Sequence, residues 1–345
     1  MNPLRFIFLQ NLLCCFLLPV IGAAQVSLQS VVAVKGDGIY SLLRRNGVSP
    51  TKYYNRFVEL NANSLGESES LYVGHSYLLP DTLTPKKVEE TDTRFTYPIF
   101  GKELAKIDSV SNRLDGTVYY LISGHGGPDP GAVEKYDGKL IAEDEYAYDV
   151  TLRLARELLA HGAEVHIIVQ DENDGIRDAR ILEPDTDEMV LSNAIPLGQL
   201  ARLKQRTKAV NDLYLKNRGK YQRLLVTHVD SRSTGTNIDV FFYHHEKSDN
   251  GKRLAESIHQ TFLEKYKKFQ PNRQYNGTFM ERSSLYVVKN TLPSMVYIEI
   301  GNIRSKTDQR RILDPDNRQA LAKWISEGII LDYESLNPAL KMSKR

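Results

Sequence analysis

The chain has 345 residues, of which 41% are hydrophobic, so it can form one large domain or two ordinary ones and has the composition of a soluble globular protein. Its 45 lysines and arginines are balanced by 43 aspartates and glutamates, which are mixed along the sequence. This balance gives no indication of nucleic acid or an anionic membrane as a partner.

The first segment is typical of a secretory signal peptide over residues 1–24. A basic residue precedes an apolar run over 6–21, and small residues at 22–24 offer a cleavage site. A transmembrane anchor is the less favoured alternative, because the run is shorter than the ~20 residues of a spanning helix. Both cysteines, Cys14 and Cys15, lie in this segment, so the mature chain would hold no disulfide and no Cys-ligated metal. We therefore expect a periplasmic or secreted protein.

Residues 28–80 show a strand–helix–helix–strand pattern. A Val-rich run over 31–34 and a turn precede two helical stretches, of which the second ends at Asn61, and a further strand lies in 72–80. The Val-Lys-Gly-Asp opening and the Val-Gly-x-x-Tyr-Leu-x-Pro ending resemble a LysM domain. LysM modules bind glycans that contain N-acetylglucosamine, so the resemblance implies that the turn at 37–40 lines a glycan groove. A small packing or protein-contact domain is the alternative.

Residues 81–116 are predicted to be a linker and lead-in segment, because they begin with many polar residues and few apolar ones. Strands then alternate with helices through 117–331, which predicts an α/β fold with a mostly parallel sheet flanked by helices. The predicted strands lie at 118–122, 165–169, 223–227, 240–243 and 295–301. The long connection at 171–198 is either a functional loop or a solvated surface excursion. Residues 332–345 are predicted to be a polar tail.

Two of the predicted strands end in histidines. His125 follows the first strand within the run Ser-Gly-His-Gly-Gly-Pro-Asp-Pro-Gly-Ala, and His228 ends the strand at 223–227. Open α/β sheets place their active sites at the carboxyl ends of strands, so we expect both imidazoles at one edge. A lone histidine is more often an ordinary polar residue, and further ligands are needed. Asp129 either supports the His125 ring or stabilises the turn.

Two glutamates complete a candidate metal site. In the helix after the Gly-rich loop, apolar residues recur at every fourth position from Tyr146 to Leu158, with Glu143 at the centre of this stripe and Glu145 nearly opposite. We take Glu143 as the ligand and keep Glu145 as the alternative, because the helix could begin after Glu143. Glu299 lies within an apolar strand, where a buried charge needs a partner. Two histidines and one glutamate with an open fourth position form a hydrolytic zinc arrangement, and the second glutamate can handle protons.

Together these motifs resemble the zinc-dependent N-acetylmuramoyl-L-alanine amidases over about residues 117–331. The resemblance rests on Gly-His-Gly-Gly, Asp-Pro-Gly-Ala, Glu143, Thr-His-Val-Asp and Glu-Ile-Gly, which agree in order and spacing. It implies that His125, Glu143 and His228 bind zinc and that Glu299 is catalytic. The implied substrate is the amide bond between N-acetylmuramic acid and L-alanine in peptidoglycan. Cell-wall remodelling or daughter-cell separation is the expected role, and an activator protein is a candidate partner.

The sequence departs from the family pattern at two places. The family commonly has Ser-Ile-His followed by Ala and Asn or Asp, where this chain has Thr-His-Val-Asp-Ser-Arg over 227–232, and commonly has Phe where this chain has Asn302. Both departures bear on specificity for the peptide side of the substrate. Some relatives carry an inserted helix that covers the zinc, and an acidic residue in 171–198 is a candidate for the same role. The alternative functions are a zinc hydrolase for another wall bond, such as a carboxypeptidase or deacetylase, and a non-catalytic wall-binding protein.

Overall fold

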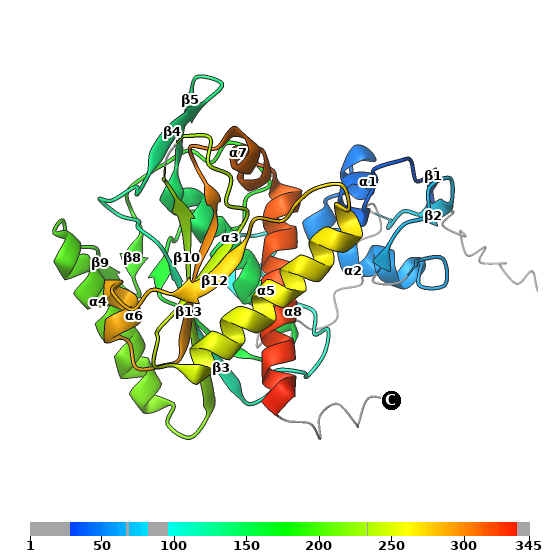
Figure 1. The fold of residues 1–345 in the computed structure, drawn as a ribbon. Coiled ribbons are helices and arrows are strands. Elements are labelled where there is room, and N and C mark those ends of the chain that lie inside the picture. Colours follow the sequence, from blue (N-terminus) through cyan, green and yellow to red (C-terminus); the bar gives the residue numbers. More distant parts are fainter. Residues whose placement is uncertain (1–27, 67–68, 82–95, 233, 337–345) are drawn as a thin grey trace, which may run out of the picture.

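The computed structural model describes residues 28–66, 69–81, 96–232 and 234–336, which form a small N-terminal unit beside a larger α/β unit (Figure 1). The predicted signal peptide at 1–24 lies outside the described residues. Within the described part of the chain, none of the helices is long and apolar enough to cross a membrane.

A six-stranded sheet forms the middle of the larger unit, with the strand order β12-β11-β13-β10-β3-β6. Its strands are β3 (Thr117–Ser123), β6 (Glu164–Ile167), β10 (Tyr221–Asp230), β11 (Phe241–His244), β12 (Thr278–Glu281) and β13 (Met295–Asn302). Strand β11 runs antiparallel to β13, and all the other neighbours pair in parallel. The predicted mostly parallel sheet is confirmed.

Helices cover both faces of this sheet (Figure 1). The helices of the larger unit are α3 (Glu143–Ala160), α4 (Gln199–Lys216), α5 (Asp249–Phe269), α6 (Tyr286–Asn290), α7 (Lys306–Ile312) and α8 (Pro315–Leu336). Along β3, Tyr119 and Leu121 join the core beneath α3, α5 and α8, whereas Tyr120 and Ile122 join the core beneath α4 and α6. Both faces of the strand are buried, so its sequence reads as an apolar run without polar alternation.

Two small sheets lie outside the predicted elements. The hairpin β4 (Val133–Tyr136) and β5 (Lys139–Ala142) immediately precedes α3. The short antiparallel strands β7 (Val169–Gln170), β8 (Met189–Val190) and β9 (Asn193–Ala194) form a second sheet around the long connection. The connection at 171–198 is therefore partly structured.

The larger unit extends past both of its predicted boundaries. Residues 96–116 contain the 3-10 helix η3 (Pro98–Phe100), and Phe100 and Leu114 of this segment are buried in the core beneath α3. At the other end, α8 continues beyond residue 331 to Leu336. Residues on both flanks of 117–331 thus pack against the larger unit and help to close its core.

The N-terminal unit has the predicted strand–helix–helix–strand order. Strands β1 (Ser30–Val32) and β2 (Ser76–Leu78) pair antiparallel, and α1 (Ile39–Arg45) and α2 (Pro50–Leu60) lie between them in the chain. The unit has a core of its own, which includes Leu42, Phe57 and Tyr77. The Asn61 amide donates to the carbonyls of Phe57 and Leu78 and accepts from the Leu78 N–H, so it ties α2 to β2.

Polar contacts join the N-terminal unit to α8. Arg44 pairs with Asp316 at 2.7 Å, and Lys323 pairs with Glu69 at 2.8 Å. Tyr40, in the turn predicted to line a glycan groove, stacks on Tyr54 with 4.8 Å between ring centroids. Burial and the charge of the Glu157 carboxylate on α3 raise the pKa of Tyr40. This part of the turn therefore faces the larger unit.

Candidate active site

The candidate site lies at the carboxyl ends of three neighbouring strands. His125 follows β3, His228 is in β10, and Glu299 is in β13. In the parallel register, His228 lies directly opposite Glu299, and Thr227 lies opposite Ser123 at the end of β3. The sheet order thus brings together side chains that are far apart in the sequence.

Glu143 lies between the two histidines. Its Oε1 is 2.9 Å from His228 Nδ1, and its Oε2 is 3.3 Å from His125 Nε2. One potential ligand atom from each of the three residues lies within 4.8 Å of the other two. Helix α3 begins at Glu143, so this side chain projects from the first residue of the helix towards the strand ends.

Glycines make room for this close approach. A Cβ atom at Gly124 would lie 2.3 Å from the His228 ring, and one at Gly131 would lie 2.7 Å from both His125 and Glu143. The loop also holds His125 at φ 60° and Gly131 at φ 68°, a backbone region that favours glycine. The Gly-rich run is therefore required sterically around the histidines.

Neighbouring groups hold each of the three side chains in place. Asp129 Oδ2 lies 3.0 Å from His125 Nδ1, and the other carboxylate oxygen accepts from Gly131 N–H, so Asp129 fills both roles considered for it. Glu143 accepts from the backbone N–H groups of Ala132 and Val229 at 3.0 and 2.9 Å. The His228 ring stacks on Tyr297, with 4.5 Å between centroids.

The pKa values of the two glutamates in the site are shifted in opposite directions. Burial works to raise the pKa of Glu143, but the hydrogen bond from His228 and the charges of both histidines outweigh it and lower that pKa. Glu299 is only 7% exposed, and its Oε2 has no hydrogen-bond partner among the described residues. Burial, together with the charges of Glu143 and Asp230, raises the pKa of Glu299 well above its ordinary value.

These residues fit a zinc ion. Two imidazole nitrogens and one carboxylate oxygen converge, which is a ligand set of hydrolytic zinc sites. A bound cation would offset the negative charge that now opposes ionisation of Glu299. The unpartnered Glu299 oxygen beside this ligand set is the observation that favours a cation here.

A cleft of about 490 Å³ opens at the site. Its lining residues are His125, Glu143, His228, Val229, Asp230, Ser231, Arg232, Arg282, Tyr297 and Glu299. The connection at 171–198 contributes no residue to this lining. The covering role considered for an acidic residue of that connection stays a prediction.

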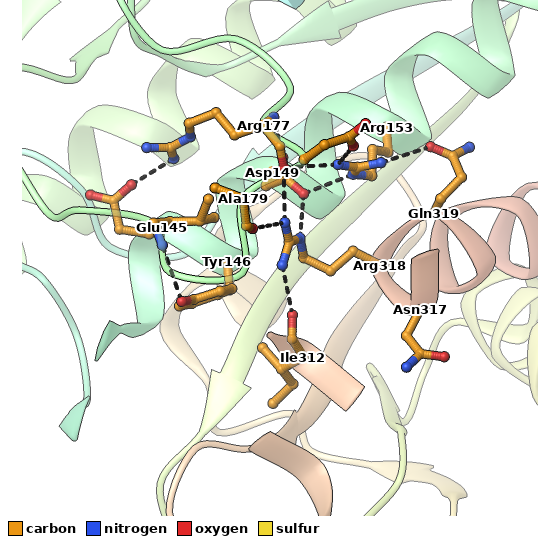
Figure 2. A network of polar contacts seen from close by, with 12 residues as sticks. Glu145, Tyr146, Asp149, Arg153, Arg177, Ala179, Ile312, Asn317, Arg318 and Gln319 are labelled. Carbon is orange, nitrogen blue, oxygen red and sulfur yellow. Dashed lines mark hydrogen bonds and ion pairs between the residues drawn. The ribbon is translucent and has the colours of Figure 1, made fainter. Parts of the chain in front are cut away.

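Glu145, the alternative ligand, has a different environment. It accepts from Arg177 Nη2 at 2.6 Å and from the Asp185 backbone N–H at 3.2 Å, as Figure 2 shows in part. Both of these partners belong to the connection at 171–198. Glu145 thus anchors the connection to α3 on the side away from the histidines.

A second set of charged residues, which we call the Asp149 cluster, comprises the buried Asp149, Arg153 and Arg318 and the half-buried Arg177 (Figure 2). Asp149 Oδ2 accepts from Arg153 at 2.7 Å and Arg318 at 2.6 Å, and its Oδ1 accepts from the Arg177 backbone N–H at 2.9 Å. Arg318 also donates to the backbone carbonyls of Arg177 and Ala179. The cluster joins α3, α8 and the start of the long connection.

The connection at 171–198 also contacts the loop that carries His125. Glu188 accepts from the Gly127 backbone N–H at 2.6 Å, and burial raises the pKa of Glu188 to about 7. The sequence analysis did not single out Glu188, nor Tyr297 and Arg282 in the cleft. Their local sequences carry no motif, and only the tertiary fold brings them to the site.

A family model described as N-acetylmuramoyl-L-alanine amidase matches residues 120–331. No curated protein sequence matches the chain.

Several solved structures resemble the larger unit. Cwp6 from Clostridium difficile is 20% identical with a TM-score of 0.46, and the match covers 62% of this chain but only 29% of Cwp6, so this chain spans less than a third of that protein's length. The amidase AmiC2 of Nostoc punctiforme is 20% identical with a TM-score of 0.44, over 64% of this chain and 97% of AmiC2. The CwlD amidase of Clostridioides difficile, solved in complex with the GerS lipoprotein, is 19% identical with a TM-score of 0.46, over 64% and 100%.

Proposed function

Because this chain belongs to the N-acetylmuramoyl-L-alanine amidase family and is thus an amidase of peptidoglycan, we propose that it works as a zinc hydrolase. The bond it cleaves joins the lactyl group of N-acetylmuramic acid to the L-alanine of the stem peptide. The observation that carries the zinc proposal is the convergence of His125, Glu143 and His228 beside the buried Glu299 in an open cleft.

In this proposal His125, Glu143 and His228 hold the zinc ion. When bound, zinc polarises a carbonyl oxygen and makes water more acidic. Asp129 orients the His125 ring, and the stack with Tyr297 orients the His228 ring. Such supporting contacts fix the tautomer and direction of each imidazole.

Glu299 acts as the general base and then as the general acid. Its carboxylate takes a proton from the attacking water as the new C–O bond forms on the scissile carbonyl. It then gives that proton to the departing L-alanine nitrogen as the C–N bond breaks. Its burial and raised pKa support this role, because a carboxyl group that readily holds a proton can both accept and return one.

The test is digestion of purified murein sacculi, with mass spectrometry of the products. We expect stem peptides with a new L-alanine amino terminus and glycan strands with a free lactyl carboxylate. A chelator should abolish the reaction, and added zinc should restore it. Intact sacculi after zinc reconstitution would contradict the proposal, and release of terminal amino acids or acetate would support a carboxypeptidase or a deacetylase instead.

We also propose that the enzyme acts in the cell envelope, in wall remodelling or daughter-cell separation. Family membership supports an extracellular or periplasmic location, because peptidoglycan lies outside the cytoplasm. An activator protein stays a predicted partner. Adding candidate envelope proteins to the sacculus assay and measuring the rate tests this prediction.

The N-terminal unit is proposed to hold the enzyme near its polymer by binding glycan weakly, so that it raises the effective concentration of substrate. A chain without residues 28–80 should lose activity on intact sacculi and keep its activity on a small soluble muropeptide. Because the unit contacts α8, thermal unfolding of both proteins has to be compared. Equal loss on both substrates would indicate a folding role.

A further inference from the structure

Two arginines line the side of the cleft that the zinc proposal does not use. Arg232 follows β10, and Arg282 follows β12, so the fold brings them together from separate parts of the chain. Arg232 falls in the run 227–232, where the sequence departs from the common family pattern. Both arginines line the same cleft as Glu299.

Arg232 is held by its neighbours. Its Nε pairs with Asp230, its Nη2 donates to the Tyr243 hydroxyl at 3.1 Å, and its guanidinium lies 4.9 Å from the Phe241 ring centroid. The charge of Arg232 is therefore compensated by Asp230. Arg232 forms a fixed wall of the cleft.

Arg282 has no such compensation. Among the described residues, its guanidinium has no hydrogen bond and no ion pair, and the side chain is exposed. It lies 5.0 Å from the Tyr243 ring centroid, and its backbone N–H donates to the His244 carbonyl at 3.0 Å. A guanidinium that rests on an aromatic ring keeps its planar N–H groups available, and these match the geometry of a carboxylate.

We propose that Arg282, beside Arg232, binds a carboxylate of the stem peptide and makes the enzyme selective for acidic stem peptides. This inference rests on the proposed amidase function, because the stem peptide is part of that substrate. A single charge-assisted hydrogen bond gained by the acidic peptide corresponds to about a ten- to hundredfold preference in kcat/KM.

The test uses two soluble muropeptides that differ only in whether the α-carboxylate of the second stem residue is free or amidated. The zinc-loaded full chain should prefer the free carboxylate about ten- to hundredfold, mainly through KM. Arg282→Gln should bring this ratio close to one and keep its zinc content. Arg282→Lys should retain part of the preference. Arg310→Gln on α7, which removes an exposed charge away from the cleft lining, should keep the wild-type ratio.

Binding of the two matching peptide products, followed by NMR titration, separates this inference from the proposed function. If neither muropeptide is cleaved but the acidic product binds more tightly and loses that advantage in Arg282→Gln, the amidase proposal fails and the carboxylate site stands. If both muropeptides are cleaved with the same ratio in wild type and Arg282→Gln, the carboxylate site is overturned and the amidase proposal stands. Equal binding of the two products by the wild-type protein would also overturn the site.

Discussion

Helix α3 carries two buried carboxylates in contrasting environments. Asp149 faces Arg153 and Arg318, and the side chains of all three are at most 1% exposed. Glu143 faces two histidines at the bottom of an open cleft and shares its surroundings with the buried Glu299. The charge of Asp149 is compensated by arginines within the protein, whereas no lysine or arginine among the described residues is bonded to Glu143 or Glu299 in the cleft.

This contrast shows that buried charged groups serve two different purposes in the protein. A buried ion pair that is fully hydrogen-bonded fixes the relative positions of the segments that supply it, here α3, α8 and the start of the long connection. In the cleft, the two histidines lower the pKa of Glu143, whereas burial raises the pKa of Glu299, so that the Glu299 carboxyl group readily holds and exchanges a proton. The same helix thus contributes one rigid joint and one reactive site.

The largest expected effect is on catalysis in the cleft. Glu299→Gln should lower kcat by about two to four orders of magnitude, because it removes the proposed general acid and base. Its zinc content, measured by mass spectrometry, should stay stoichiometric. Glu256→Gln, at an exposed position of α5, is the control and should match wild type in both measurements. Wild-type turnover in Glu299→Gln would show that the roles are wrongly assigned.

At the Asp149 cluster we expect a loss of stability. Asp149→Asn leaves the buried Arg318 without its carboxylate partner, whereas Arg153 keeps its pair with Asp178, and the change should lower the free energy of unfolding by about 3–5 kcal/mol, measured by denaturant titration. Asp212→Asn breaks an exposed ion pair with Lys208 and should cost at most about 0.5 kcal/mol. A cost below about 1 kcal/mol for Asp149→Asn would remove the contrast between the two carboxylates.

The pH dependence of stability should report on the same cluster. Burial opposes ionisation of Asp149, but the charges of Arg153 and Arg318 lower its pKa from 3.8 to about 2. The stabilisation is fully present above the unfolded pKa and is lost as the pH falls through the folded pKa. The stability advantage of wild type over Asp149→Asn should therefore shrink by about 2 kcal/mol between pH 5 and pH 2. A constant difference over this range would mean that the pKa of Asp149 is the same in the folded and the unfolded protein.

The smallest effect is expected at Glu145, which lies on α3 between Glu143 and Asp149. Glu145→Gln should keep stoichiometric zinc and lower the free energy of unfolding by about 1 kcal/mol, because it weakens the contact with Arg177. Glu143→Gln, its matched variant, should lose zinc. The reverse outcome would make Glu145 the ligand and would overturn the helix-face argument.

The parts of this molecule that follow from local pattern were predictable from its sequence. Strands buried on both faces read as apolar runs, and histidines at their carboxyl ends must meet at one sheet edge, so the approach of His125 to His228 was predicted. The position of Glu143 followed from the apolar stripe of α3. The short strands β7, β8 and β9 were missed, since segments of two residues are too short to show an alternation of apolar and polar side chains.

Features that depend on tertiary neighbours were not predictable. Arg282 reaches the cleft because β12 pairs with β11, and nothing in its local sequence indicates that pairing. Asp149, Arg153 and Arg318 are charged residues on helices that no sequence motif marks, and all three are buried, because each finds its partner on another turn or another element.

The place of β13 in the sheet has a consequence for how the enzyme is made. It is the last strand among the described residues, yet it lies between β10 and β11, so the β11–β12 pair has no place in the main sheet until β13 is synthesised. Pairing of such distant segments is slow. A growing or truncated chain that ends before residue 295 lacks both Glu299 and the strand that joins β10 to β11, so we expect it to be inactive.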